Sequence, residues 1–221
     1  MPRAVAVFLG PSCEREVAGT IIPSKFLLPP AARGDLTAAA EDGARIITLI
    51  DGVFFQESAV GHREILAALK SGIRVIGASS MGALRAAELN TLGMEGVGLI
   101  YRLYRDGVLV SDDEVALVYD PDDYTPLSEP LVNIRCTLRK AREEGILAAD
   151  DAAALLSAAR SVYFPDRTYP HICEQAEGSV PPATLRSFLE YTRHHAVDQK
   201  REDALEALRR TKAIAAGTGG Q

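Results

Sequence analysis

Short apolar runs alternate with amphipathic stretches along the first half of this chain. Four apolar or β-branched runs, each closed by Gly, Pro or Asp, are predicted to be strands: residues 4–9, 26–28, 45–50 and 73–77. Amphipathic spacing predicts helices at residues 35–41, 59–70 and 95–105. Strands that alternate with helices through short links predict a largely parallel sheet flanked by helices.

The pattern changes after the first half of the chain. Residues 114–119 are predicted as an edge strand and 163–170 as a rigid, aromatic-rich link, and helices are predicted at 131–144, 149–163, 182–194 and 199–215. We therefore expect an α/β fold, with an N-terminal, mostly parallel sheet followed by an all-helical C-terminal half. The expected domains are an α/β core at 1–125, a helical region packed on it at 126–216, and a flexible tail at 217–221.

Composition narrows the classes of function. With 221 residues, 47% of them hydrophobic, the chain can bury a sizeable core. Its net charge of -6 argues against nucleic-acid or membrane partners, and no apolar run approaches the ~20 residues of a membrane span. Three widely spaced cysteines suggest neither a disulfide framework nor a zinc site. We expect a cytoplasmic protein without metal or cofactor, because phosphate-binding glycine motifs are also missing from the sequence.

The segment with the clearest chemistry follows the strand at 73–77. It reads Ala78-Ser79-Ser80-Met81-Gly82, a near miss of the Gly-x-Ser-x-Gly nucleophile elbow, and then turns into helix formers. Ser80 would stand at a helix start, where the N–H groups of Met81 and Gly82 can hold an oxyanion. The alternative is that Ser79 or Ser80 only caps the helix, and the pattern alone favours capping.

Polar residues also follow two other strands. Ser12 comes after the first strand and Asp51 after the third, while Ser79 and Ser80 come after the fourth. Sites in parallel sheets gather outside the carboxyl ends of the strands. If these strands are neighbours, the side chains converge at one edge of the sheet.

Three further residues are candidates for the same site. His62 has the chemistry of a general base, whereas Arg63 stays protonated and can only hold an anion; both could instead be solvated at a helix start. Arg85 could point toward the strand ends, or it could pair with Glu88 one helical turn away.

Ordered motifs along the chain resemble one known family. They are Leu9-Gly10-Pro11-Ser12, Pro29-Pro30 with Gly34-Asp35, Ile50-Asp51-Gly52, His62-Arg63-Glu64-Ile65-Leu66, the segment from Ser80 to Leu89, Gly93-Met94-Glu95-Gly96-Val97-Gly98, Asp112-Asp113-Glu114-Val115-Ala116, and Leu127-Ser128-Glu129 with Val132-Asn133-Ile134-Arg135. Together they resemble the TfuA family, named for a protein of trifolitoxin biosynthesis. The resemblance runs from about residue 5 to 135 and more weakly to 169.

The resemblance implies a partner of a YcaO enzyme. YcaO enzymes use ATP to activate a backbone amide of a ribosomally made peptide or protein, whose oxygen is then replaced by sulfur. The implied role is to hydrolyse the thiocarboxylate of a small ThiS-like carrier protein through a Ser–Lys pair and so deliver sulfide. Ser80 would be the nucleophile, with Met81 and Gly82 holding the oxyanion.

One departure from the family pattern concerns the base. The family lysine is expected in a His-Lys-Glu context, where this chain has His62-Arg63-Glu64. The base is then His62 or a residue elsewhere, or the protein is mainly an adaptor that strengthens YcaO–substrate binding. A third alternative is an α/β domain that binds a small anion with Ser80 and Arg85.

Overall fold

A computed structural model describes residues 4–53 and 58–217 of the chain. Contacts between Cα atoms divide the chain into two compact units, one of Met1–Asp112 with Lys200–Gln221 and one of Asp113–Gln199. This division into packing units differs from the domain limits expected from the sequence, 1–125 and 126–216, which stay a prediction. Of the expected tail at 217–221, only Gly217 is described, where it ends a helix; the rest lies outside the described residues.

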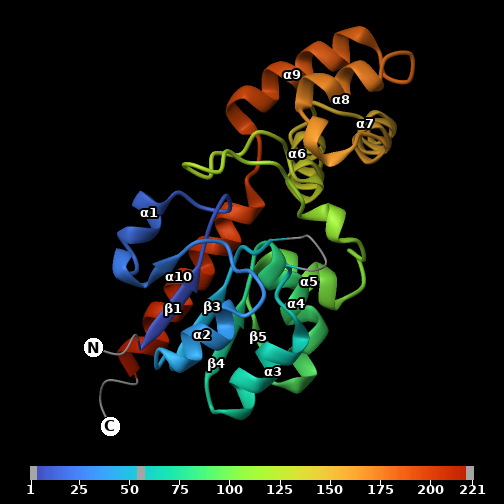
Figure 1. The fold of residues 1–221 in the computed structure, drawn as a ribbon. Coiled ribbons are helices and arrows are strands. Elements are labelled where there is room, and N and C mark those ends of the chain that lie inside the picture. The colour runs from blue at the N-terminus through green and yellow to red at the C-terminus, as the bar shows by residue number, and fades with distance from the viewer. Residues whose placement is uncertain (1–3, 54–57, 218–221) are drawn as a thin grey trace. The chain divides into compact units, whose positions relative to one another are not determined.

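The first unit is built on a five-stranded parallel sheet (Figure 1). Its strands are β1 (Val5–Phe8), β2 (Leu27–Leu28), β3 (Ile46–Leu49), β4 (Arg74–Gly77) and β5 (Glu95–Gly96). Their order is β2-β1-β3-β4-β5. This is a doubly wound order: β2 is added on one side of β1, whereas β3, β4 and β5 follow on the other side. Ligands of such sheets bind at the switch point between β1 and β3.

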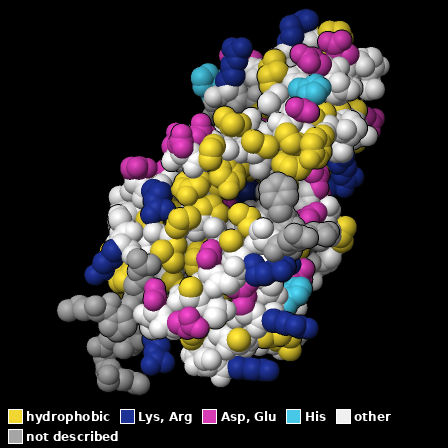
Figure 2. All heavy atoms as spheres, in the orientation of Figure 1, with side chains coloured by type: hydrophobic (Ala, Val, Ile, Leu, Met, Phe, Trp, Pro, Cys, Tyr) yellow, Lys and Arg dark blue, Asp and Glu magenta, His cyan; other side chains and the backbone are white. Residues whose placement is uncertain are grey.

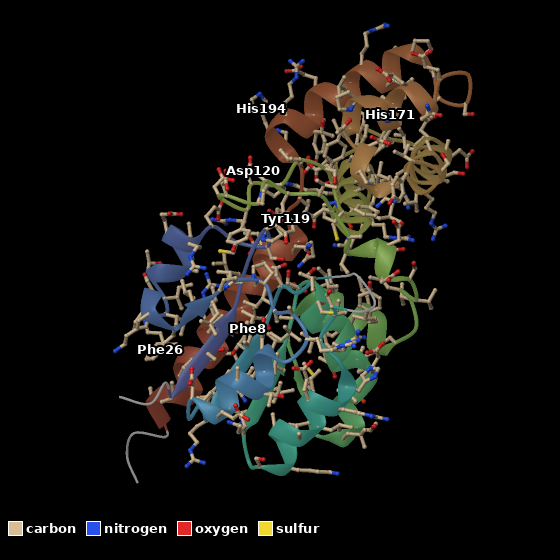
Figure 3. The ribbon with its side chains drawn as sticks, in the orientation of Figure 1. Phe8, Phe26, Tyr119, Asp120, His171 and His194 are labelled. Carbon is tan, nitrogen blue, oxygen red and sulfur yellow. The ribbon has the colours of Figure 1, made fainter. Side chains whose placement is uncertain are left out.

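Helices cover both faces of this sheet. They are α1 (Arg15–Gly19), α2 (Asp35–Glu41), α3 (His62–Lys70), α4 (Met81–Leu89), α5 (Gly98–Arg105) and α10 (Gln199–Gly217). Phe8, labelled in Figure 3, packs with α2, α3 and α4 on one face. On the other face Val7 and Ile76 pack with α1 and α10. The α/β architecture expected from the alternating pattern is confirmed.

The second unit is helical. Its helices are α6 (Leu131–Glu143), α7 (Ala149–Ser161), α8 (Tyr169–Gln175) and α9 (Pro182–His195). They enclose a core of their own around Ile134, Leu155, Ile172 and Phe188. His171 lies on α8 and His194 on α9 (Figure 3). The expectation that helix follows helix in the C-terminal half is confirmed.

Three local predictions were wrong. Residues 114–119 form no strand, because Glu114 is buried and paired with Arg135, and a short 3-10 turn at Asp112–Glu114 takes its place. The helix predicted from residue 95 begins at Gly98, since Glu95 and Gly96 pair with β4 instead. The predicted link at 163–170 ends inside α8, a helix that the pattern did not indicate.

The described helices contain none that is both long and apolar enough to cross a membrane. On the face seen in Figure 2, positive and negative side chains are interspersed over much of the surface.

Candidate functional site

The ends of three neighbouring strands meet at the carboxyl edge of the sheet. Ser12 follows β1, Asp51 follows β3 and Ser79 follows β4, and all three residues are at most 2% exposed. Ser79 Oγ donates a hydrogen bond of 2.9 Å to Ser12 Oγ, which donates one of 2.6 Å to Asp51 Oδ1. Strands β1, β3 and β4 are therefore neighbours, as the expected convergence of these polar side chains requires.

Asp51 ties the first strand to the third across the switch point. Its second carboxylate oxygen accepts the backbone N–H groups of Gly10 at 2.9 Å and Ser12 at 3.1 Å. Hydrogen bonds to an ionised group are stronger than those between neutral groups, and buried charge is tolerated only when it is paired or hydrogen-bonded. The carboxylate therefore fixes the loop that carries Ser12.

Ser79 occupies a strained position in the turn from β4 to α4. Its φ is 65°, in the left-handed region that residues other than glycine seldom adopt. The N–H of Ser80 donates to the carbonyl of Ala78 at 2.8 Å and closes a three-residue turn around Ser79. Such strain costs about 1–3 kcal/mol and persists where the surroundings hold it. The hydrogen bond to Ser12 is one such restraint.

The strained turn leaves Ser80 at the N-cap position of α4, but Ser80 does not cap the helix. Its side chain makes no cap hydrogen bond, and within residues 4–53 and 58–217 Ser80 Oγ has no hydrogen-bond partner. The side chain is nevertheless 2% exposed. Capping by Ser80, which the sequence pattern favoured, is therefore wrong, and its hydroxyl is uncommitted.

The N–H groups of Met81 and Gly82, which were expected to hold an oxyanion, differ in their hydrogen bonding. The N–H of Gly82 donates to the carbonyl of Ile50 at 3.2 Å and is committed to the sheet. The N–H of Met81 has no acceptor among the residues that the structure describes. An unpaired N–H at a helix N-terminus favours an anion, because the helix dipole adds to its partial charge.

The first turn of α4 lies directly on the sheet. A Cβ at Gly82 would lie 1.7 Å from the carbonyl oxygen of Leu49, and one at Gly77 would lie 2.1 Å from the carbonyl oxygen of Gly82. Glycine at positions 77 and 82 therefore allows this helix to pack close to the sheet. The close approach fixes where Ser80 and Met81 stand at the edge.

His62 and Arg63 are not joined to the serines. His62 Nε2 lies 2.7 Å from Glu88 Oε2 on the surface, and Arg63 is exposed with no hydrogen bond or ion pair in the described part of the chain. Arg85 Nη1 donates to the same carboxylate at 2.7 Å, and its Nε donates to the carbonyl of Val60 at 3.0 Å. Arg85 therefore pairs with Glu88, which was one of the two alternatives that the sequence left open.

A pocket of about 600 Å³ begins beside this turn. Met81 and Arg85 line it from α4, Gly61 from the start of α3, and Val110 from the segment after α5. The residue next to Ser80 thus forms part of its wall.

Lys200 is a buried residue that the sequence reasoning missed. It lies in the first turn of α10 and is 2% exposed, although lysine is seldom fully buried. Hydrogen bonds from Arg201 to Glu14 and from Leu99 N–H to Asp203 place that turn at the carboxyl edge of the sheet. Lys200 shares a helical stripe with Ala204 and Thr211, but this local spacing did not indicate where the helix packs.

A comparison with protein families gives one match. A family model described as TfuA-like protein matches residues 51–168, just over half of the chain. The chain belongs to the TfuA-like family. Members of the family act with YcaO enzymes, and the chain has a role of that kind. The matched region includes Asp51, Ser79, Ser80 and Arg85, whereas Ser12 and Lys200 lie outside it. No curated protein matches the chain.

Proposed function

We propose that this TfuA-like protein hydrolyses the thiocarboxylate of a small ThiS-like carrier and delivers sulfide to a YcaO enzyme for backbone thioamidation of a ribosomally made peptide or protein. One observation carries the catalytic part of this proposal. Ser80 stands at a helix N-cap, and neither its hydroxyl nor the N–H of the adjacent Met81 has a hydrogen-bond partner among the residues that the structure describes. A nucleophile next to an oxyanion donor is the arrangement that acyl transfer requires.

In the proposed reaction Ser80 Oγ attacks the carbonyl carbon, and the negative oxygen of the tetrahedral intermediate accepts the N–H of Met81. The carbon–sulfur bond then breaks, sulfur leaves as hydrosulfide with the serine proton, and an acyl ester remains on Ser80. Water attacks the ester carbon and releases serine, the carrier carboxylate and one proton. The net change is thiocarboxylate plus water to carboxylate, hydrosulfide and a proton.

The serine proton needs a base, and Arg63 cannot be that base because guanidinium stays protonated in proteins. We assign the role to Lys200, since a desolvated lysine is a recognised general base. Ala204, one turn along α10 from Lys200, belongs to the same core cluster as Ala78 on the strand side of the Ser80 turn. His62 is the competing base, and it is an exposed residue whose Nε2 lies 2.7 Å from Glu88 Oε2.

The proposal is tested by sulfide release from a thiocarboxylated carrier. Ser80→Ala should lower release by about a thousandfold or more, while binding to the YcaO enzyme is retained. Lys200→Met should also abolish release, whereas His62→Ala should have little effect. Release by Ser80→Ala at the wild-type rate would disprove serine catalysis.

The second candidate function is a non-catalytic adaptor that strengthens binding of YcaO to its substrate. The observation that favours it is an acidic turn in the helical unit, where Asp122 and Asp123 are exposed and Asp120 is half-buried (Figure 3). Such a turn suits a basic partner. The adaptor function predicts that Asp122→Lys with Asp123→Lys weakens YcaO binding, and that Ser80→Ala leaves thioamidation unchanged.

A further inference from the structure

A second pocket lies at the edge of the sheet that β5 forms. It has a volume of about 550 Å³ and is lined by β5 with the turn after it, by α5 and by α10, all of which belong to the first unit. This volume lies within the usual range for small-molecule sites. The lining includes neither Ser79 nor Ser80, so this pocket needs an explanation of its own.

The lining of this pocket is rich in arginine. The charged side chains that line it are Arg102 and Arg105 from α5, Arg209 and Arg210 from α10, and the two glutamates Glu95 and Glu206. Positive charge is therefore in excess here, although the chain as a whole has a net charge of -6. The planar fork of arginine pairs with two oxygens of one phosphate group at once, which favours a phosphate ligand.

Two of the four arginines are already engaged. Arg105 donates to both carboxylate oxygens of Asp106, at 2.8 and 3.2 Å, and Arg210 donates to the carboxylate at the start of β5. In the part of the chain that the structure describes, Arg102 and Arg209 make no hydrogen bond and no ion pair. One uncommitted guanidinium therefore comes from each of the two helices, which suits a ligand with more than one negative charge.

The edge strand adds a backbone donor. The N–H of Val97 donates to the carbonyl of Gly77 on β4 at 2.9 Å. Because the N–H groups of successive residues in a strand point to opposite sides, the N–H of Gly96 points away from β4. It has no acceptor among residues 4–53 and 58–217. Glycine allows a ligand to approach the backbone closely, so this N–H is accessible to an anion.

The backbone around the pocket is held in place without a ligand. The carboxylate of Asp203 on α10 accepts the N–H of Leu99 at 3.0 Å and that of Ile100 at 2.7 Å, and Asp203 is 1% exposed. This ties the first turn of α5 to α10. The ring of Tyr101 fills the space where a Cβ of Gly96 would lie. Binding therefore has to order little more than the arginine side chains.

We propose that this pocket binds a diphosphate group, held by Arg102, Arg209 and the N–H of Gly96. The group is free pyrophosphate or part of a nucleoside diphosphate, since both present the same anion. Donors that line one concave pocket suit a compact anion, whereas an acidic protein segment would spread its charges over a longer surface. The proposal does not depend on the proposed hydrolysis.

Binding is tested by calorimetry on the full chain with sodium pyrophosphate, in about 0.15 M salt to screen non-specific attraction. Pyrophosphate should bind at least about tenfold more tightly than orthophosphate, which can engage fewer of the donors. Arg102→Gln and Arg209→Gln should each weaken pyrophosphate binding about tenfold. Lys212→Gln removes the same charge from an exposed position one turn along α10, outside the pocket, and should change the affinity less than about twofold.

The amide of Gly96 gives a second measurement. Its NMR signal should shift when pyrophosphate is added to the wild-type protein and should stay in place for the double variant Arg102→Gln with Arg209→Gln. Several outcomes overturn the proposal: no binding of pyrophosphate, equal binding of orthophosphate, or a loss in Lys212→Gln as large as in the arginine variants. Binding of hexaglutamate in preference to pyrophosphate would assign the pocket to an acidic protein segment instead.

A comparison of ADP with pyrophosphate distinguishes the two sources of the diphosphate. Glu206 makes no hydrogen bond within the described residues, and its carboxylate can accept the hydroxyl groups of a ribose. Tighter binding of ADP that is lost in Glu206→Gln identifies a nucleotide, and equal or weaker binding of ADP identifies free pyrophosphate. Sulfide release by Arg102→Gln at the wild-type rate, together with weakened pyrophosphate binding, would show that this site and the hydrolase site are separate.

Discussion

Ser79 and Ser12 are 67 residues apart in the sequence, and their hydroxyl groups are joined by a hydrogen bond of 2.9 Å at the carboxyl edge of the sheet. Ser12 continues the connection to Asp51, so the loops after three parallel strands are tied together. The connection restrains the left-handed turn at Ser79 and thereby sets the position of Ser80. The two adjacent serines therefore differ in role: Ser79 is held by its hydrogen bond to Ser12, whereas the hydroxyl of Ser80 makes no cap hydrogen bond.

The strain at Ser79 predicts an order of stability for two variants. Ser79→Ala keeps the positive φ and loses the hydrogen bond, which should cost about 1–2 kcal/mol. Ser79→Gly also loses the hydrogen bond but relieves the backbone, so it should be more stable than Ser79→Ala by about 1 kcal/mol. Urea unfolding measures the difference, and a glycine variant less stable than the alanine variant would show that the turn is not strained.

Removal of the Asp51 carboxylate should destabilise the sheet unit. Asp51→Ala leaves the buried N–H groups of Gly10 and Ser12 without their acceptor, at a cost of about 3–5 kcal/mol. Asp51→Asn keeps one acceptor oxygen and should cost less. The exposed Asp42 is the matched control, since Asp42→Ala should change stability by less than about 0.5 kcal/mol. Equal melting temperatures for the Asp51 and Asp42 alanine variants would contradict this account.

Gly82 should not tolerate a side chain. An added Cβ would lie 1.7 Å from a backbone oxygen of β3, so Gly82→Ala must push α4 away from the sheet. We expect a loss of at least about 3 kcal/mol in unfolding free energy. Gly61→Ala, at the start of α3 with open space around it, should cost only a few tenths of that. Circular dichroism during thermal unfolding compares the two, and a Gly82→Ala protein as stable as Gly61→Ala would refute the close contact.

The helical unit should lose stability as the pH rises. Burial, together with the carboxylate of Asp198, raises the pKa of Glu129 from its ordinary 4.5 to about 7. The folded state therefore binds this proton more tightly than the unfolded chain does. The resulting stabilisation is fully present below about pH 4.5 and is lost as the pH rises through about 7.

Glu129→Gln tests this pH dependence. The variant should lack the loss of stability between about pH 5 and pH 8 and should exceed wild type at pH 8 by up to about 3 kcal/mol. Glu177→Gln, at an exposed position of the same unit, should follow the wild-type curve. Urea unfolding at a series of pH values gives the comparison, and parallel curves for wild type and Glu129→Gln would contradict it.

The sequence was sufficient for the first four strands and for the polar residues that follow β1, β3 and β4. Apolar runs closed by Gly, Pro or Asp predicted β1, β3 and β4, and the convergence of Ser12 and Asp51 depended only on strand order. Strand order itself was not readable, because it follows from how helices pack on the two faces. The sequence also did not show which of the two serines is hydrogen-bonded within the site, because Ser79 and Ser80 are adjacent and chemically alike. The difference between them arises from the backbone angle φ of Ser79.

Other features required long-range packing to be known. Lys200 lies in α10, whose inward face meets β3 through the hydrogen bond between Thr211 and Thr48. Nothing in local spacing indicated that this last helix returns to the first unit. The two-residue strand β5 was likewise too short to show a hydrophobic periodicity, and it is defined only by its pairing with β4.

The most direct test of the central claim is to trap the acyl ester. Wild-type protein is mixed with a thiocarboxylated carrier, quenched in acid within the first turnover, and digested for mass spectrometry. Catalysis by Ser80 predicts a carrier-derived acyl group on the peptide that contains Ser80, localised to that residue and missing from the Ser80→Ala protein. Sulfide release with the acyl group on Ser79, or release without any covalent intermediate, would contradict the assignment.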